Sequence, residues 1–235
     1  MQTTYTPTSA RAATSARWER LALASGAVAA GMFLAGAALF IGFVAPHMPA
    51  LDAQPTEQVA FYALRAHNPI YRLVSYLGEA QMPALLLFFG GLLGVLRRAE
   101  RGEGALSMAV FAAGVAIAVI APLTIMIEDH LLLSMATLPI DPLVVRSFDG
   151  LGPVAFGLSG YPQALVLLGT AALLGRQLPR WITWLGLLTA ALCAVASGTP
   201  VLAQLFPFAA LSALLFRVWL LALSITLLRR AGSAE

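Results

Sequence analysis

The sequence predicts an all-α polytopic membrane protein with six transmembrane helices in one bundle. Hydrophobic residues make up 60% of the chain and charged residues only 11%, whereas soluble domains carry about 25% charged residues. Each of six long apolar stretches reaches roughly the 20 residues that a helix needs to cross a hydrocarbon core about 30 Å thick. The stretches are Leu21–Ala45, Leu77–Val95, Ala105–Ile127, Leu151–Leu174, Trp181–Leu202 and Phe206–Leu228.

The first stretch is predicted to be a membrane helix that is retained rather than a cleaved signal peptide. It is 25 residues long, whereas the apolar region of a signal peptide has about 7–15 residues. The polar segment before it, rich in Ser, Thr and Ala, is predicted to be disordered. The expected organisation is a cytoplasmic tail over residues 1–20, a six-helix domain over 21–230 and a second cytoplasmic tail over 231–235.

The arginines predict the orientation of the six helices. All fourteen basic residues are Arg, and short cytoplasmic loops of membrane proteins are enriched in basic residues. Ten arginines flank the stretches on one side of the predicted membrane: Arg11, Arg17, Arg20, Arg97, Arg98, Arg101, Arg176, Arg180, Arg229 and Arg230. This distribution predicts a multi-pass membrane protein with both termini in the cytoplasm.

Composition excludes several classes of site. The single cysteine, Cys193, permits neither an intrachain disulfide nor a cysteine-based metal site. The absence of Lys excludes a lysine Schiff base and a phosphate-binding loop lysine. The arginines lie in short loops with no recognisable nucleic-acid motif, so no nucleic-acid partner is expected.

The loops place any site in the outer half of the bundle. The inner loops are too short for a catalytic domain, whereas the outer segments 46–76 and 128–150 are longer. The first contains TEQVAFYALRAH, which predicts a short interfacial helix ending at Asn68-Pro69. The second contains LLLSMATLPI, which is too short to span and predicts an interfacial or re-entrant segment.

Of the four remaining arginines, Arg65, Arg72 and Arg146 lie in the outer segments, whereas Arg217 lies in the middle of the sixth apolar stretch. A charge at the centre of a membrane helix costs about 2.5–3.5 kcal/mol even on insertion scales, so such residues face the bundle interior and find a partner. Helical side chains lean toward the N-terminus of their helix. Arg217 should therefore lean outward and Glu128, on an antiparallel helix, inward, which predicts an Arg217–Glu128 pair with Asp129 and Glu79 as alternates.

Two interpretations of Arg217 stay open at this stage. In one, a buried salt bridge locks the third and sixth helices together. In the other, Arg217 binds an anionic substrate or lipid headgroup, for which its planar guanidinium is suited, or takes part in coupled proton movement. Any protons would then be carried by Glu79, Glu128, Asp129 or His130. The predicted ligand-binding residues are Arg217, Glu128, Asp129, Glu79 and Gln163. The other polar residues at the outer ends of the helices are Gln81, Tyr161, Ser197, Thr199 and Gln204.

A metal site is a weaker alternative. All three histidines fall on the predicted outer side, and a zinc site would draw on His47, His130 and Glu128. The chain has no HExxH spacing, and adjacent helical residues point in different directions. The sequence therefore identifies neither a metal nor another cofactor.

The hairpin between the fourth and fifth stretches is similar to part of a known family. Phe156-Gly157-Leu158, Leu167-Leu168-Gly169, Leu178-Pro179-Arg180-Trp181-Ile182 and Leu185-Gly186-Leu187-Leu188 resemble the corresponding hairpin of a bacterial six-span membrane family, domain of unknown function 4386. The resemblance covers some forty residues. It implies a six-span protein of the bacterial inner membrane and, since that family has no settled activity, no function.

The leading functional hypothesis is a non-enzymatic membrane protein with an outward-facing polar pocket. It would bind or pass a small, anionic or lipid-like molecule, with Arg217 as the anchor. One alternative is a membrane-embedded enzyme that uses the outer carboxylates and histidines, with or without a metal. Another is an accessory subunit of a membrane complex. The sequence predicts no oligomeric state.

Overall fold

The computed structural model describes the whole chain except residues 1–8, 50–52, 136–140 and 233–235. The described residues form helices and no strand. The α-helices are α1 (Ser9–Leu39), α2 (Pro55–His67), α3 (Pro69–Ala99), α4 (Ala105–Met135), α5 (Pro142–Asp149), α6 (Leu151–Leu158), α7 (Gly160–Leu174), α8 (Arg180–Ala196) and α9 (Phe206–Gly232). A π-helical turn (Phe40–Val44) and 3₁₀ turns (Ala45–His47, Ala203–Leu205) complete them.

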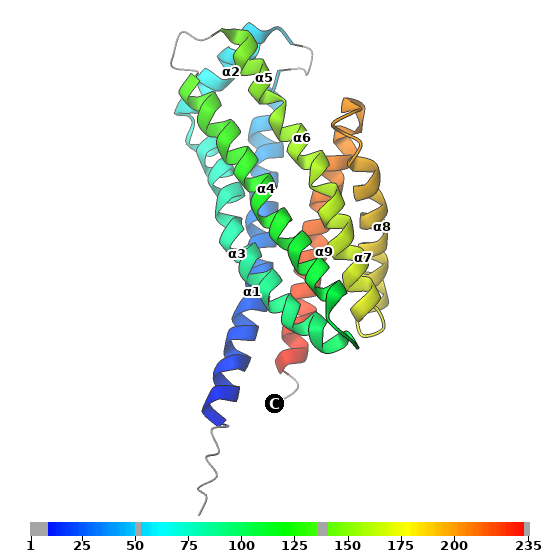
Figure 1. The fold of residues 1–235 in the computed structure, drawn as a ribbon. Helices are drawn as coiled ribbons and strands as arrows, with labels where there is room; N and C mark the ends of the chain where they lie inside the picture. The colour runs from blue at the N-terminus through cyan, green and yellow to red at the C-terminus, as the bar shows by residue number, and fades with distance from the viewer. Residues whose placement is uncertain (1–8, 50–52, 136–140, 233–235) are drawn as a thin grey trace, which may run out of the picture.

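The long helices form a closed ring. Going round it, α1 packs on α3, α3 on α4, α4 on α7, α7 on α8, α8 on α9, and α9 returns to α1. Figure 1 shows α1 beginning and α9 ending at one end of the bundle, with α2 and α5 at the other. Buried Leu, Ile, Val and Phe side chains from all of the ring helices fill its centre.

Five helices of the described chain are long and apolar enough to cross a membrane, judged by length and composition. They are 17–47, 69–99, 105–124, 151–174 and 206–232. These correspond to five of the six predicted stretches. The remaining helix, α8, has 17 residues and is about 26 Å long at 1.5 Å per residue, slightly less than a typical hydrocarbon core. The structure therefore supports an all-α membrane bundle with five clear candidate spans.

The N-terminal segment departs from the sequence prediction. Residues 1–20 were expected to be disordered, yet α1 begins at Ser9 and continues without a break into the first apolar stretch. The segment SARAATSAR is rich in Ala and Arg, which have high helix propensity. Because the apolar stretch already provides a helical nucleus, adding residues to its end avoids the nucleation penalty.

The two longer loops build a cap over one end of the ring. The predicted interfacial helix is present as α2, and it ends at Asn68, whose side chain accepts a hydrogen bond from the Ile70 backbone N–H at the start of α3. A second apolar cluster joins α2, α3 and α5 to the end of the first helix; its buried members are Val44, Phe61, Tyr62, Tyr71 and Val145. The guanidinium of Arg65 lies 5.5–6.0 Å from three of these aromatic rings.

The second loop also departs from the prediction. Its first part, Leu131–Met135, continues α4 instead of forming a separate interfacial piece. The run is apolar and follows a helix directly, with no Gly or Pro to end it, so the helix extends beyond the predicted boundary at Ile127. The remainder of the predicted interfacial piece, residues 136–140, lies outside the described residues.

The fourth stretch is not one uninterrupted α-helix. It divides at Ser159 into α6 and α7, although Ser159 keeps right-handed helical angles (φ −66°, ψ −14°). Pro162 has no N–H to donate to the preceding turn, which weakens the helix at this point. The interruption directs Ser159 and Gln163 toward the centre of the ring, where the candidate site lies.

Candidate functional site

The candidate site is a small cavity on the axis of the bundle. Its lining residues come from every helix of the ring except α8: Phe33, Gln81, Ile117, Pro122, Phe156, Ser159, Gln163, Ala213 and Arg217. The centre of a water molecule can occupy about 20 Å³ of this space. Since one water needs roughly 10–15 Å³ by this measure, the cavity accommodates a group of about that size.

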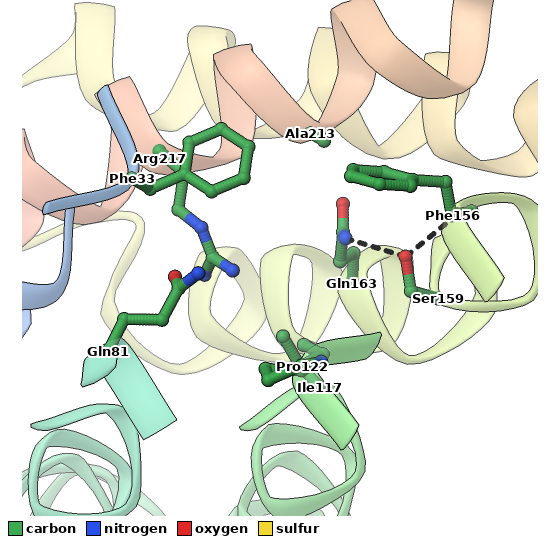
Figure 2. A pocket seen from close by; sticks show the side chains of 9 residues that line it. All are labelled: Phe33, Gln81, Ile117, Pro122, Phe156, Ser159, Gln163, Ala213 and Arg217. Carbon is green, nitrogen blue, oxygen red and sulfur yellow. Dashed lines mark hydrogen bonds between the residues drawn. The ribbon is translucent and has the colours of Figure 1, made fainter. Parts of the chain in front are cut away.

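Arg217 places a cation in this cavity. It lies near the middle of α9 and is 5% exposed. Figure 2 shows its side chain extending into the cavity that Gln81 also lines. Among the described residues, nothing accepts a hydrogen bond from its Nε or Nη1.

The aromatic rings beside Arg217 offset only part of the free-energy cost of burying its charge. The guanidinium carbon lies 4.9 Å from the ring centre of Phe33 and 5.5 Å from that of Phe216. A desolvated cation–π contact contributes about 2 kcal/mol, whereas removing an ion from water costs several kcal/mol even after relaxation. The two rings therefore position the cation without fully compensating for its burial.

The other polar groups of the cavity are largely bonded to one another. Gln163 Nε2 donates to Ser159 Oγ (3.0 Å), and Ser159 Oγ donates to the carbonyl of Phe156 (2.7 Å). Gln163 Oε1 accepts from the thiol of Cys193 (3.5 Å). Gln81 Nε2 donates to the carbonyl of Gly78 (2.9 Å), but Gln81 Oε1 is buried without a partner. The groups of the cavity that lack a hydrogen-bond partner are thus mainly the N–H donors of Arg217, together with the Oε1 acceptor of Gln81.

The predicted carboxylate partners of Arg217 are not seen beside it. Glu79 is half-buried on α3 and does not line the cavity. It precedes Gln81 by two residues, and positions two apart on a helix do not share a face. The side chains of Glu128 and Asp129, on α4, lie outside the described part of the structure, so the predicted Arg217–Glu128 pair stays a prediction.

Of the predicted polar residues, two line the cavity and the others do not. Gln81 and Gln163 line the cavity together with Arg217, whereas Tyr161 and Gln204 are exposed. Ser197 and Thr199 are buried but donate to backbone carbonyls of the preceding turn. Such local bonds satisfy the two hydroxyls without forming a site.

Sequence reasoning missed Ser159 and Phe33. Ser159 precedes Gln163 by one helical turn, and this spacing could have placed the two on one face. Phe33 offers no such signal, because an apolar residue in an apolar helix resembles every other core position.

The weaker metal hypothesis finds no support in the described residues. No three of their His, Cys, Asp and Glu side chains come together in a group that could hold a metal ion. His47 and His130 are exposed, and the side chain of Glu128 is outside the described part.

Comparison with protein-family models, with curated proteins and with solved structures yields no match for this chain. The resemblance to domain of unknown function 4386 therefore stays a prediction. The site has to be interpreted from its own geometry and chemistry.

Proposed function

We propose that the chain is a six-span protein of the bacterial inner membrane, with both termini in the cytoplasm, that binds the anionic group of a small molecule at Arg217. The orientation rests on the sidedness of the arginines. The anion-binding role rests on one observation: a cation that is 5% exposed reaches into a cavity with two of its N–H donors unpartnered among the described residues.

The chemistry of the cavity supports an anion over a neutral or cationic ligand. Arg donates hydrogen bonds and accepts none, and its guanidinium stays charged in proteins. A buried cation is strongly unfavourable unless it is paired. An anion that accepts from Arg217 supplies both the hydrogen bonds and the opposite charge.

The proposal is tested by the thermal stability of the purified protein in detergent. A ligand that binds only the folded state raises the melting temperature with its concentration. We expect at least one of chloride, acetate, phosphate or decanoate to raise the Tm of the wild type saturably at constant ionic strength. The same anion should leave Arg217→Gln unaffected.

Arg229→Gln is the matched control, since Arg229 lies on the same helix but is exposed near its end. This variant removes the same charge and should keep the wild-type response. An identical response of the wild type and Arg217→Gln to every anion would contradict the proposal.

A further inference from the structure

The size of the cavity, its single charge and its apolar walls restrict which anion can occupy it. We infer that the occupant is one weakly hydrated, monovalent anion of halide size, such as chloride, held within the bundle against Arg217. This inference rests on the proposed function and specifies its ligand. It selects a halide in place of the carboxylate, phosphate or lipid-like groups that are also compatible with the proposed function.

The volume gives the first restriction. A space of about 20 Å³ suits one species about as large as a water molecule. A phosphate group with its four oxygens, or a carboxylate with an attached chain, is several times larger than one water. Either group would have to displace the buried rings of Phe33 and Phe156 or widen the helix interruption at Ser159.

The charge gives the second restriction. Arg217 is the one ionisable residue among the described residues that line the cavity, so a single negative charge neutralises it. A dianion would leave a net negative charge in a low-dielectric core, which is as unfavourable as the unpaired cation. A monovalent ion is therefore the best electrostatic match.

The walls give the third restriction. Five of the nine lining residues are apolar: Phe33, Ile117, Pro122, Phe156 and Ala213. The hydrogen-bonding groups of Ser159 and Gln163 are already engaged with their neighbours. The donors left are chiefly those of Arg217, which cannot replace the hydration of sulfate or phosphate. An ion that loses its water easily is favoured in such an environment.

Bromide is the probe for this inference because it resembles chloride, and the two ions should compete for the same site. The protein is exchanged into gluconate buffer at constant ionic strength, and the Tm is followed as gluconate is replaced by bromide, chloride, acetate or sulfate. At a hundred times its Kd, the bound halide should raise the Tm of the wild type by about 5 °C or more. Acetate and sulfate should produce no saturable rise.

The order of the anions distinguishes the site from a general salt effect. Sulfate stabilises proteins through exclusion from their surface, so a general effect would rank sulfate above bromide. Binding in the cavity predicts the reverse order at low concentration. Bromide and chloride should also compete, so that saturation with chloride abolishes the response to bromide.

Two variants place the response in the cavity. Arg217→Gln removes the charge, and Ala213→Val fills part of the space from the same helix while keeping Arg217. Both should weaken the halide response at least tenfold, and Arg229→Gln should keep it. If Arg217→Gln does not fold, Ala213→Val and the competition in the wild type still test whether the halide binds in the cavity.

The outcomes separate this inference from the proposed function. An Arg217-dependent response to acetate, phosphate or decanoate with none to halides overturns the halide assignment and leaves anion binding in place. A halide response that Ala213→Val and Arg217→Gln both retain overturns the location. If no anion acts through Arg217, the inference and the proposed function both fail.

Discussion

Arg217 keeps its positive charge inside a protein, but its buried surroundings do not hydrate that charge. Its guanidinium carbon lies 4.9 Å and 5.5 Å from the centres of two aromatic rings, and its side chain lines the cavity. A guanidinium whose purpose was structural would be expected to bond to a carboxylate within the core. Among the described residues, Nε and Nη1 have no partner, so the stability of the folded protein should depend on what fills the cavity.

The first prediction concerns the substitution Arg217→Met, measured by Tm in gluconate buffer. Met has a similar length and no charge, so it removes the unpaired cation while it fills much of the same space. Replacing buried charged groups by apolar residues is often neutral or stabilising by about 1–4 kcal/mol. We expect the variant to melt at the wild-type temperature or above it in gluconate, and to show no response to anions.

The opposite result has a specific meaning. A large loss of stability in Arg217→Met that is reversed by adding Glu128→Gln would show that the two residues form a structural pair. Arg229→Met serves as the control for loss of one arginine from α9. It should change the Tm by little, because exposed surface substitutions generally alter stability by less than about 0.5 kcal/mol.

At the scale of helices, the sequence predicted the crossings better than their ends. The start of α9 at Phe206 and the division between α7 and α8 agree with the predicted stretches, because hydropathy changes sharply there. The start of α3 at Pro69 was missed by several residues. Its first turns contain both polar and apolar residues. They are helical because Asn68 caps their N-terminus and Tyr71 packs into the second apolar cluster, between α2, α3 and α5.

The sequence also does not predict which glycines of α1 pack closely against other helices. The sequence shows several small residues at helical spacing, including Gly26 and Gly31, but it does not say which of them touches a neighbour. A Cβ on Gly26 would lie 2.3 Å from both the Phe88 ring and the Ser224 hydroxyl, whereas one on Gly31 would meet nothing within 4 Å. Close packing at Gly26 depends on the positions of α3 and α9, which no local pattern contains.

The second prediction follows from this difference. Gly26→Ala should destabilise the bundle by about 1–3 kcal/mol, since overpacking forces buried side chains to move. Gly31→Ala is the matched control on the same helix, and it should be neutral or slightly stabilising because Ala is the better helix former. The comparison is made by thermal or denaturant unfolding in one detergent. Equal effects of the two substitutions would contradict the packing of α1 on Phe88 and Ser224.

The third prediction concerns the turn between α3 and α4, outside the apolar layer. Glu100 accepts hydrogen bonds from the backbone N–H groups of Leu106 (2.9 Å) and Ser107 (2.8 Å) at the start of α4. The hydrogen bonds from Ser107, through its side chain and its backbone, hold the pKa of Glu100 below the ordinary value of 4.5. The carboxylate therefore caps the N-terminus of α4.

A carboxyl with a lowered pKa in the folded state stabilises the protein above its ordinary pKa. That stabilisation is lost as the pH falls through the lowered value. Glu100→Ala should therefore lower the Tm by a few degrees at pH 7, and the difference from the wild type should shrink below about pH 4.5. Glu103→Ala, in the same loop and exposed, is the control. A difference that is independent of pH would contradict the capping role of the charge.

At the scale of the whole molecule, the closed ring explains why one arginine can organise a site. Six segments of the described chain run along the bundle, and five of them, all but α8, contribute residues to the cavity. The ring thereby brings Phe33, Gln81 and Gln163 to Arg217 from distant parts of the sequence. That convergence is a consequence of packing order, which the sequence does not state, whereas the need of Arg217 for a partner can be predicted from its position alone.

The last prediction tests whether α8 crosses the membrane, which decides between five and six spans. With Cys193 replaced by Ala, single cysteines are placed at exposed positions on either side of α8, Gln177→Cys and Val201→Cys. Glu103→Cys and Glu57→Cys provide reference positions for the two ends of the bundle. Labelling with a membrane-impermeant thiol reagent is compared between intact cells and inverted vesicles.

If α8 crosses and both termini are cytoplasmic, as proposed, Val201→Cys and Glu57→Cys react in intact cells, whereas Gln177→Cys and Glu103→Cys react only in inverted vesicles. The ring argues for this result, because α8 packs along both α7 and α9. Its length of about 26 Å needs only a small local thinning of the bilayer, at a fraction of a kcal/mol per Å of mismatch. Labelling of Gln177→Cys and Val201→Cys from the same side would instead leave α8 within one leaflet and place the two termini on opposite sides.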